Sequence, residues 1–198
     1  MSKIFDVYHQ LTFYGAYHNN KINIAIHILC VPLLLWSAFV ILYPIPLPEL
    51  VPQFTFAIND YLIFELNKVP TILAAIYLAY YFALEPFAAL LYTPQIVFGL
   101  VSATAYAHNP ANMTNALILH GACWIAQFLG HGLAEGRSPA LLDNLLGAVV
   151  LAPFFVHLEI LFSLGYRPEL HKRLTNSIGV EITKLRKAQG DARRAKAE

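Results

Sequence analysis

The stretch that decides the fold runs from residue 68 to residue 135: KVPTILAAIYLAYYFALEPFAALLYTPQIVFGLVSATAYAHNPANMTNALILHGACWIAQFLGHGLAE. Between its charged ends, Lys68 and Glu135, the only formal charge is that of Glu85. So few charges cannot cover a surface that faces water. The stretch therefore predicts apolar helices that lie within a membrane.

The composition of the whole chain supports the same interpretation. Of its 198 residues, 58% are hydrophobic and 13% are charged, and the mean hydropathy is +0.54. A soluble domain carries about 25% charged residues. We therefore predict an all-α fold, a polytopic membrane helical bundle.

About four to five hydrophobic segments are expected. They cover residues 24–43, two halves of 69–106 that meet at Glu85-Pro86, 116–133 and 141–164. Residues 1–20 are polar and aromatic, which predicts a short interfacial helix, and a loop is expected before Lys68. Five spans would place the two termini on opposite sides, whereas Lys3, Lys21 and the basic tail favour the cytosol for both. One segment is then re-entrant or interfacial.

Positive charge is concentrated at the carboxyl end. Nine of the 13 Lys and Arg residues lie at or after Arg167. Apolar residues recur there at helical spacing, namely Leu174, Ile178, Ile182 and Leu185. A basic amphipathic helix after apolar spans is typical of an anionic membrane surface on the cytosolic side, and argues against nucleic acid as a partner. We expect two parts, a membrane-embedded catalytic domain (1–166) and a basic cytosolic tail (167–198).

Polar side chains at bilayer depth are costly and indicate function. His27 lies near the start of the first segment, and His120 and His131 lie in the fourth. Eleven residues on one helix rotate to within about 20° of alignment. Glu135 follows His131 at i+4, so both side chains leave the same face.

The last segment carries an unusual polar load: Asp143, Asn144, His157 and Glu159. Just before it, Arg137 is the single basic residue between Lys68 and Arg167. Arg137 is expected either to anchor at the interface or pair with Glu135 or Asp143, or to bind a substrate carboxylate with its planar fork.

His18 and His27 are nine residues apart, which places them on opposite faces of a continuous helix. They converge only if a helix starts between them. Asn19-Asn20 permits this, because an asparagine side chain caps helix starts. Asn23 lies one turn before His27 and is placed to orient it.

Each histidine, taken singly, has an ordinary explanation as a partner of a backbone carbonyl or a neighbouring helix. Eight histidines, several of them on different helices near one interface, favour a metal site instead. Neutral imidazoles beside carboxylates suit Fe, Zn or Mn, and two histidines with a carboxylate and open positions suit ferrous iron.

Two patterns carry a resemblance, YHNNKINIAIH at 17–27 and WIAQFLGHGLAEGRSPALLDNL at 124–145, followed by LAPFF and Glu159. The chain resembles the fungal 2-hydroxy fatty acid dioxygenases, endoplasmic reticulum membrane proteins of phytosphingosine breakdown. The resemblance implies an Fe(II) cofactor and α-oxidation, in which a 2-hydroxy fatty acid and O₂ yield a fatty acid one carbon shorter.

The family roles transfer to a defined set of positions, His18, Asn23, His27, His131, Glu135, Arg137, Asp143 and Asn144. We expect His18, His27 and His131 to bind the iron, with Glu135 or His120 as a fourth ligand. Glu135 and Asp143 are then catalytic, and Arg137 and Asn23 bind substrate. Two alternatives stay open, another membrane lipid hydroxylase or desaturase, and a transporter or structural protein with buried histidines. The first typically uses HxxxH and HxxHH clusters for two irons, which the sequence lacks.

Overall fold

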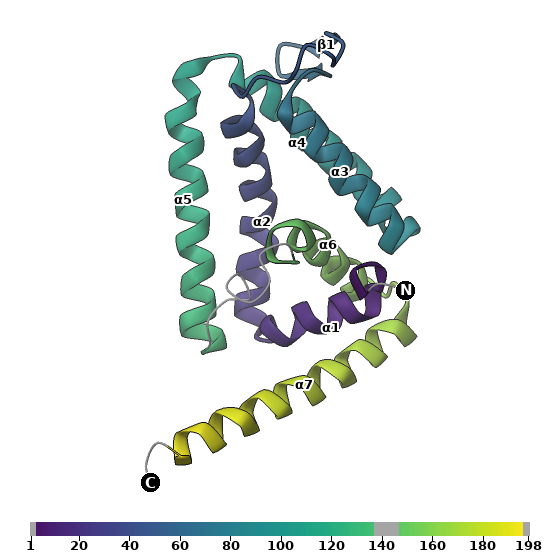
Figure 1. The fold of residues 1–198 in the computed structure, drawn as a ribbon, viewed down its shortest axis with the longest axis vertical. Coiled ribbons are helices and arrows are strands. Elements are labelled where there is room, and N and C mark those ends of the chain that lie inside the picture. Colours follow the sequence, from purple (N-terminus) through teal and green to yellow (C-terminus); the bar gives the residue numbers. More distant parts are fainter. Residues whose placement is uncertain (1–2, 137–146, 196–198) are drawn as a thin grey trace.

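The structure, a computed structural model, describes residues 3–136 and 147–195 (Figure 1). Its elements are, in chain order, η1 (Lys3–Phe5), α1 (Val7–Tyr17), α2 (Lys21–Leu42), β1 (Thr55–Asn59), β2 (Leu62–Glu65), α3 (Val69–Leu84), α4 (Pro86–Ala107), η2 (Pro110–Asn112), α5 (Met113–Leu129), the π-helical turns η3 (Gly130–Glu135) and η5 (Gly147–Leu151), α6 (Ala152–Ser163) and α7 (Pro168–Ala195). The prediction of an all-α membrane bundle is confirmed.

Three helical stretches in the described parts of the chain are long and apolar enough to cross a bilayer: Lys21–Leu42, Pro86–Ala107 and Pro110–Glu135. A fourth span results if Val149–Ser163 and Pro168–Ala188, which bend by 118°, count as one. At about 1.5 Å per residue, α2 is about 33 Å long and matches a hydrocarbon core of about 30 Å. Helix α3 has 16 residues and is shorter than such a core.

The predicted helix boundaries follow from local chemistry. The Asn20 side chain accepts a hydrogen bond from the Ile22 N–H at 2.9 Å and starts α2. Glu85 is extended (φ −153°, ψ 91°) and separates α3 from α4. The ring of Pro86 disfavours the helical conformation for the residue before it. The sequence therefore predicts both the start of α2 and the break at Glu85.

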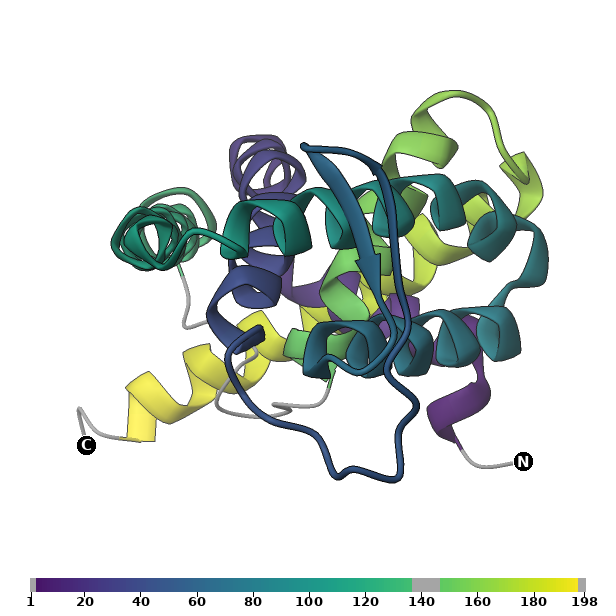
Figure 2. The ribbon, with the colours of Figure 1, turned by 90° about the horizontal axis from the view of Figure 1, so that it is seen from above.

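The helices form two pairs that meet at the hairpin end. Helices α2 and α5 lie side by side, and α3 and α4 form a second, inclined pair (Figure 1). At the other end α1 and α6 fill the space between the pairs, and α7 runs across beneath them. Figure 2 shows the same arrangement from above. Residues of α2, α3, α5 and α6 line the cavity described below.

Buried tyrosines of α3 hold the chain that leads into α6. The Tyr81 ring stacks on Phe154, with centroids 4.5 Å apart, and its hydroxyl donates to the Val150 carbonyl at 2.6 Å. The Tyr77 hydroxyl donates to the Val149 carbonyl at 3.3 Å. A π-helical turn departs from the α-helical hydrogen-bond pattern. Side-chain donors from α3 therefore help to fix η5 and, with it, α6.

The segment between α2 and α3 corrects the sequence-based expectation of a loop. It contains an antiparallel hairpin in which Thr55 pairs with Glu65 and Phe56 with Phe64. Its second strand ends at Glu65, whose side chain contacts residues at the ends of other helices.

Those partners form a polar cluster at the hairpin end of the bundle. The Glu65 carboxylate accepts hydrogen bonds from the Tyr43 hydroxyl at 2.9 Å and from His108 Nε2 at 3.0 Å. Lys68 Nζ lies 3.6 Å from the same carboxylate and 4.2 Å from the centre of the Tyr43 ring. The cluster joins the ends of α2, α3 and α4 to the hairpin.

Helix α7 docks against α1. The contact is close at Gly15, where a Cβ would lie 2.3 Å from Ile178 Cδ1. The Tyr8 hydroxyl hydrogen bonds with Ser177, and the Arg173 guanidinium lies 5.1 Å from the centre of the Tyr8 ring. The basic tail is therefore packed on the helix that precedes His18.

Candidate metal centre

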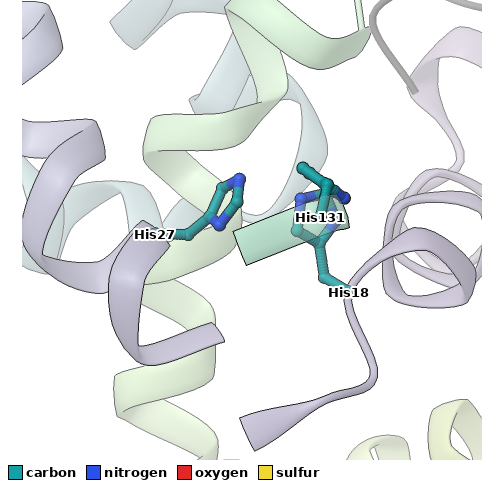
Figure 3. Close-up of side chains that lie close together, drawn as sticks. All are labelled: His18, His27 and His131. Atoms are coloured by element: carbon teal, nitrogen blue, oxygen red, sulfur yellow. The ribbon is translucent and has the colours of Figure 1, made fainter. Parts of the chain in front are cut away.

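Three histidines from separate elements meet in the interior: His18, His27 and His131 (Figure 3). One ring nitrogen of each lies within 4.8 Å of the others. The ring centroids are 4.4 Å (His18–His27), 4.7 Å (His18–His131) and 5.0 Å (His27–His131) apart, and the planes cross at 71–83°. Within the described residues, they are the group of His, Cys, Asp and Glu side chains suited to hold a metal ion.

The break between α1 and α2 brings the first two histidines together. His18 ends α1 in a non-helical conformation (φ −131°, ψ 74°), and His27 lies in the second turn of α2. His18 Nδ1 is 3.0 Å from the Tyr14 carbonyl, and His27 Nδ1 is 2.9 Å from the Asn23 carbonyl. When Nδ1 donates its proton in this way, Nε2 carries the lone pair that binds a metal. Both imidazoles are thus oriented by their own helices.

His131 is supplied by the π-helical turn η3, which continues α5. Such turns often occur at functional sites, because they redirect side chains. The turn packs closely on α2, since a Cβ on Gly130 would lie 2.6 Å from Asn23 Oδ1. Asn23 itself has no exposed surface. It orients His27 through its backbone carbonyl and contacts η3 through its side chain, and its predicted role in substrate binding stays a prediction.

Glu135, at the end of η3, joins the same three elements. Its Oε1 accepts a hydrogen bond from the Asn19 N–H at 2.5 Å, and its Oε2 accepts one from the Asn20 N–H at 2.8 Å. Asn20 Nδ2 also donates to the Ala134 carbonyl at 2.8 Å. A carboxylate at a helix start satisfies orphan N–H groups and complements the helix dipole. These contacts are those of a positioning residue, and its catalytic role stays a prediction.

His120 lies apart from the three histidines and lines the wall of an adjoining cavity. Its Nδ1 is 2.9 Å from Ser37 Oγ on α2, and its Nε2 accepts a hydrogen bond from Trp124 Nε1 at 3.0 Å. Both ring nitrogens therefore have partners that join α2 to α5. The remaining predicted residues, Arg137, Asp143 and Asn144, lie outside the described residues.

Two aromatic side chains not predicted from the sequence support His18. The Tyr14 ring stacks on His18 with centroids 3.9 Å apart, and Phe155 packs against Tyr14, also at 3.9 Å, with its centroid 6.0 Å from that of His18. Burial, and to a lesser extent the Glu159 carboxylate, raises the pKa of the Tyr14 phenol, so it stays protonated. The sequence feature that could have identified Tyr14 is its spacing from His18, because it precedes that histidine by one helical turn.

The three histidines lie at one end of an apolar cavity of about 360 Å³. Helices α2 and α5 form its long walls, and residues of α3, η5 and α6 complete it. From the histidines it extends along α2 as far as Leu42. A site of this shape suits a ligand with a polar head and a long apolar tail.

The donor set fits a metal ion. Three buried imidazole nitrogens from three elements, with ring planes nearly perpendicular, can occupy three neighbouring positions of a coordination sphere and leave others open. Imidazole suits Fe, Zn, Cu and Ni rather than Mg or Ca. The structure therefore contains a potential binding site for a transition metal.

The comparisons with known proteins agree with this geometry. Residues 4–164 match the family described as "2-hydroxy-palmitic acid dioxygenase Mpo1-like". The chain belongs to this family. It is also 30% identical over 189 residues to the 2-hydroxy-palmitic acid dioxygenase MPO1 of Saccharomyces cerevisiae, covering 92% of this chain and 95% of the yeast protein. No solved structure matches significantly. The matched region holds all three histidines, so the candidate metal centre lies in the part shared with the Mpo1-like family.

Proposed function

We propose that the chain is an Fe(II)-dependent dioxygenase that converts a 2-hydroxy long-chain fatty acid and O₂ into a fatty acid one carbon shorter. Membership of the Mpo1-like family supports an oxygenase acting on a 2-hydroxy fatty acid. The observation that carries the proposal is the three-histidine group at the end of an apolar cavity. It places metal chemistry where the polar head of an amphiphile would lie.

The proposed reaction needs no external reductant. Loss of the carboxyl carbon as CO₂ and oxidation of the hydroxyl carbon to a carboxylate release four electrons in total. These reduce one O₂, and one water is formed. The substrate therefore supplies every electron that the oxygen takes up.

Ferrous iron held by His18, His27 and His131 would supply the redox chemistry and the open positions at which the substrate oxygens and O₂ meet. The histidines hold the metal, and the carbonyls of Tyr14 and Asn23 keep their rings in orientation. The stacked Tyr14 and the apolar cavity keep bulk water away from the reacting carbons.

Two further predictions concern residues outside the described parts. Arg137 is expected to bind the substrate carboxylate, and Asp143 to act with Glu135 in catalysis. Arg137 lies two residues after Glu135, the last residue of η3, and is therefore close in sequence to His131.

The expected location is the endoplasmic reticulum membrane, with the carboxyl-terminal tail in the cytosol and no nucleic acid among the partners.

Metal analysis together with a product assay tests the proposal. Protein purified anaerobically with iron is incubated with 2-hydroxypalmitate and O₂, and fifteen-carbon acid, CO₂ and oxygen uptake are quantified. One iron per chain and one O₂ consumed per product are expected. Two irons per chain would favour a di-iron hydroxylase or desaturase, whereas no bound metal and no product would favour a transporter or structural protein.

A further inference from the structure

One face of α2, from His27 to Leu42, lines the cavity. The residues are His27, Val31, Leu34, Leu35, Ala38 and Leu42. Their spacing (i, i+4, i+7, i+8, i+11, i+15) defines a single helical stripe. After the histidine it is entirely apolar, so it offers no further position for the polar end of a ligand. A ligand whose head lies at the histidines must extend its tail along this stripe.

The length of the stripe can be compared with an acyl chain. Fifteen residues separate His27 from Leu42, which gives about 22 Å along the helix. With carbon–carbon bonds of about 1.5 Å and angles near 111°, an extended chain advances about 1.25 Å per carbon, so eighteen carbons cover about 21 Å. The stripe is therefore long enough for about eighteen carbons between the histidines and the far end of the cavity.

The far end has a polar boundary. Leu42 from α2 and Leu73 from α3 are among the last residues that line the cavity there. Immediately beyond Leu42 comes Tyr43, which donates to the buried Glu65 carboxylate. Lys68, at the start of α3, lies against the same carboxylate. Tyr43 and Glu65 do not line this cavity, so its limit is the end of its apolar lining at Leu42 and Leu73, beyond which α2 continues into the polar cluster.

The walls of the cavity are held at a set distance. The Ser37–His120–Trp124 hydrogen bonds join α2 to α5 halfway along it, at 2.9 and 3.0 Å. Trp36 Nε1 donates to Ser102 Oγ at 3.1 Å and joins α2 to α4. Because these bonds tie α2 to two neighbouring helices, the cavity cannot readily widen for a chain that is too long.

We propose that the far end of this cavity measures acyl-chain length, with Ala38, Leu42 and Leu73 as the specificity-determining residues and about eighteen carbons as the longest chain that fits. The chemistry at the head group rests on the proposed function above. The length selection rests on the apolar stripe and its polar boundary, so it applies equally to binding of a fatty acid that is not turned over.

Two substitutions change the usable length in opposite directions. Ala38 lies eleven residues from His27, or about 16 Å, so Ala38→Phe leaves room for about thirteen carbons. The double change Leu42→Ala/Leu73→Ala removes the two side chains at the far end and makes room for longer chains. Leu33→Phe is the matched control, because Leu33 is 43% exposed on the outer face of the same helix and does not line the cavity.

Two measurements are made on each variant. The first is kcat/KM for 2-hydroxy acids of ten to twenty carbons. The second is the displacement of a spin-labelled fatty acid from metal-free protein by unhydroxylated acids of the same lengths. For Ala38→Phe, the ratio of sixteen- to twelve-carbon efficiency should fall at least about tenfold, which matches the usual penalty for excess methylenes in a hydrophobic pocket. The double variant should shift its optimum upward by two or more carbons, and Leu33→Phe should match the wild type.

The two proposals fail in different ways. If the wild type turns over 2-hydroxy acids but the length profiles of Ala38→Phe and Leu33→Phe coincide in both assays, the length-measuring role is wrong and the proposed function stands. If no 2-hydroxy acid is turned over while the binding cut-off still shifts with Ala38→Phe, the proposed function is wrong and the length-measuring role stands.

Discussion

Glu135 offers the sharpest test of how the three histidines are held together. Its two carboxylate oxygens accept the Asn19 and Asn20 N–H groups, and these residues form the break between His18 and His27. Glu135 ends the turn that carries His131. A single carboxylate therefore joins the segments that supply all three imidazoles.

The change Glu135→Gln keeps the size of the side chain and one acceptor oxygen. It removes the charge and presents an NH₂ group to a backbone N–H, so one charge-assisted hydrogen bond is lost. Such a bond contributes about 1.5–3 kcal/mol, and the cluster must be assembled before a metal can bind. We expect metal affinity to fall about ten- to hundredfold, because each 1.4 kcal/mol is a factor of ten.

Affinity is measured anaerobically by competition for Fe(II) with a chromophoric chelator, alongside thermal unfolding of the metal-free protein. Glu181→Gln is the matched control, because Glu181 is exposed on α7 and forms an ion pair with the neighbouring Lys184. Wild-type metal affinity in Glu135→Gln would refute the positioning role. If turnover were lost at the same time, the carboxylate would instead take part in catalysis.

Three further outcomes are expected. His131→Ala should lose bound iron and activity while the protein still inserts and folds, whereas His120→Ala should keep its iron. Metal analysis of the two variants side by side tests this expectation. Equal losses of iron would contradict the three-histidine assignment. Gly15→Val should destabilise the protein by about 1–3 kcal/mol through overpacking against Ile178, and adding Ile178→Ala should restore much of the loss in a thermal melt. Arg137→Lys should leave iron content unchanged but lower kcat/KM about ten- to hundredfold, because lysine lacks the bidentate fork; iron lost in step with activity would contradict a role in substrate binding.

Local chemistry is where the sequence was most informative. The shortage of charge between Lys68 and Glu135 predicted the membrane helices, Asn20 predicted the start of α2, and Glu85-Pro86 predicted the break between α3 and α4. Each of these depends on residues within a few positions of one another, because capping and proline sterics act through adjacent backbone groups. The break after His18 also made convergence with His27 possible.

Contacts between distant segments could not be predicted in the same way. His120 lies on the same helical face as His131. The eleven residues between them nevertheless correspond to about 16 Å along the helix axis, so sharing a face does not bring the two imidazoles together. Likewise, the hydrogen bonds of Glu65 to Tyr43 and His108 join segments that are 22 and 43 residues apart in sequence.

The sequence by itself therefore determined that this is a helical membrane protein, where α2 begins, where α3 and α4 separate, and which histidines were candidates to meet. Only the tertiary structure decided that His131 joins His18 and His27 while His120 does not, that Glu135 caps α2, and that the histidines lie at the end of an apolar cavity. The physical reason is that periodicity and capping are set by neighbouring residues. The position of an imidazole relative to another helix depends instead on packing, on the π-helical turn and on hydrogen bonds between residues more than a hundred positions apart.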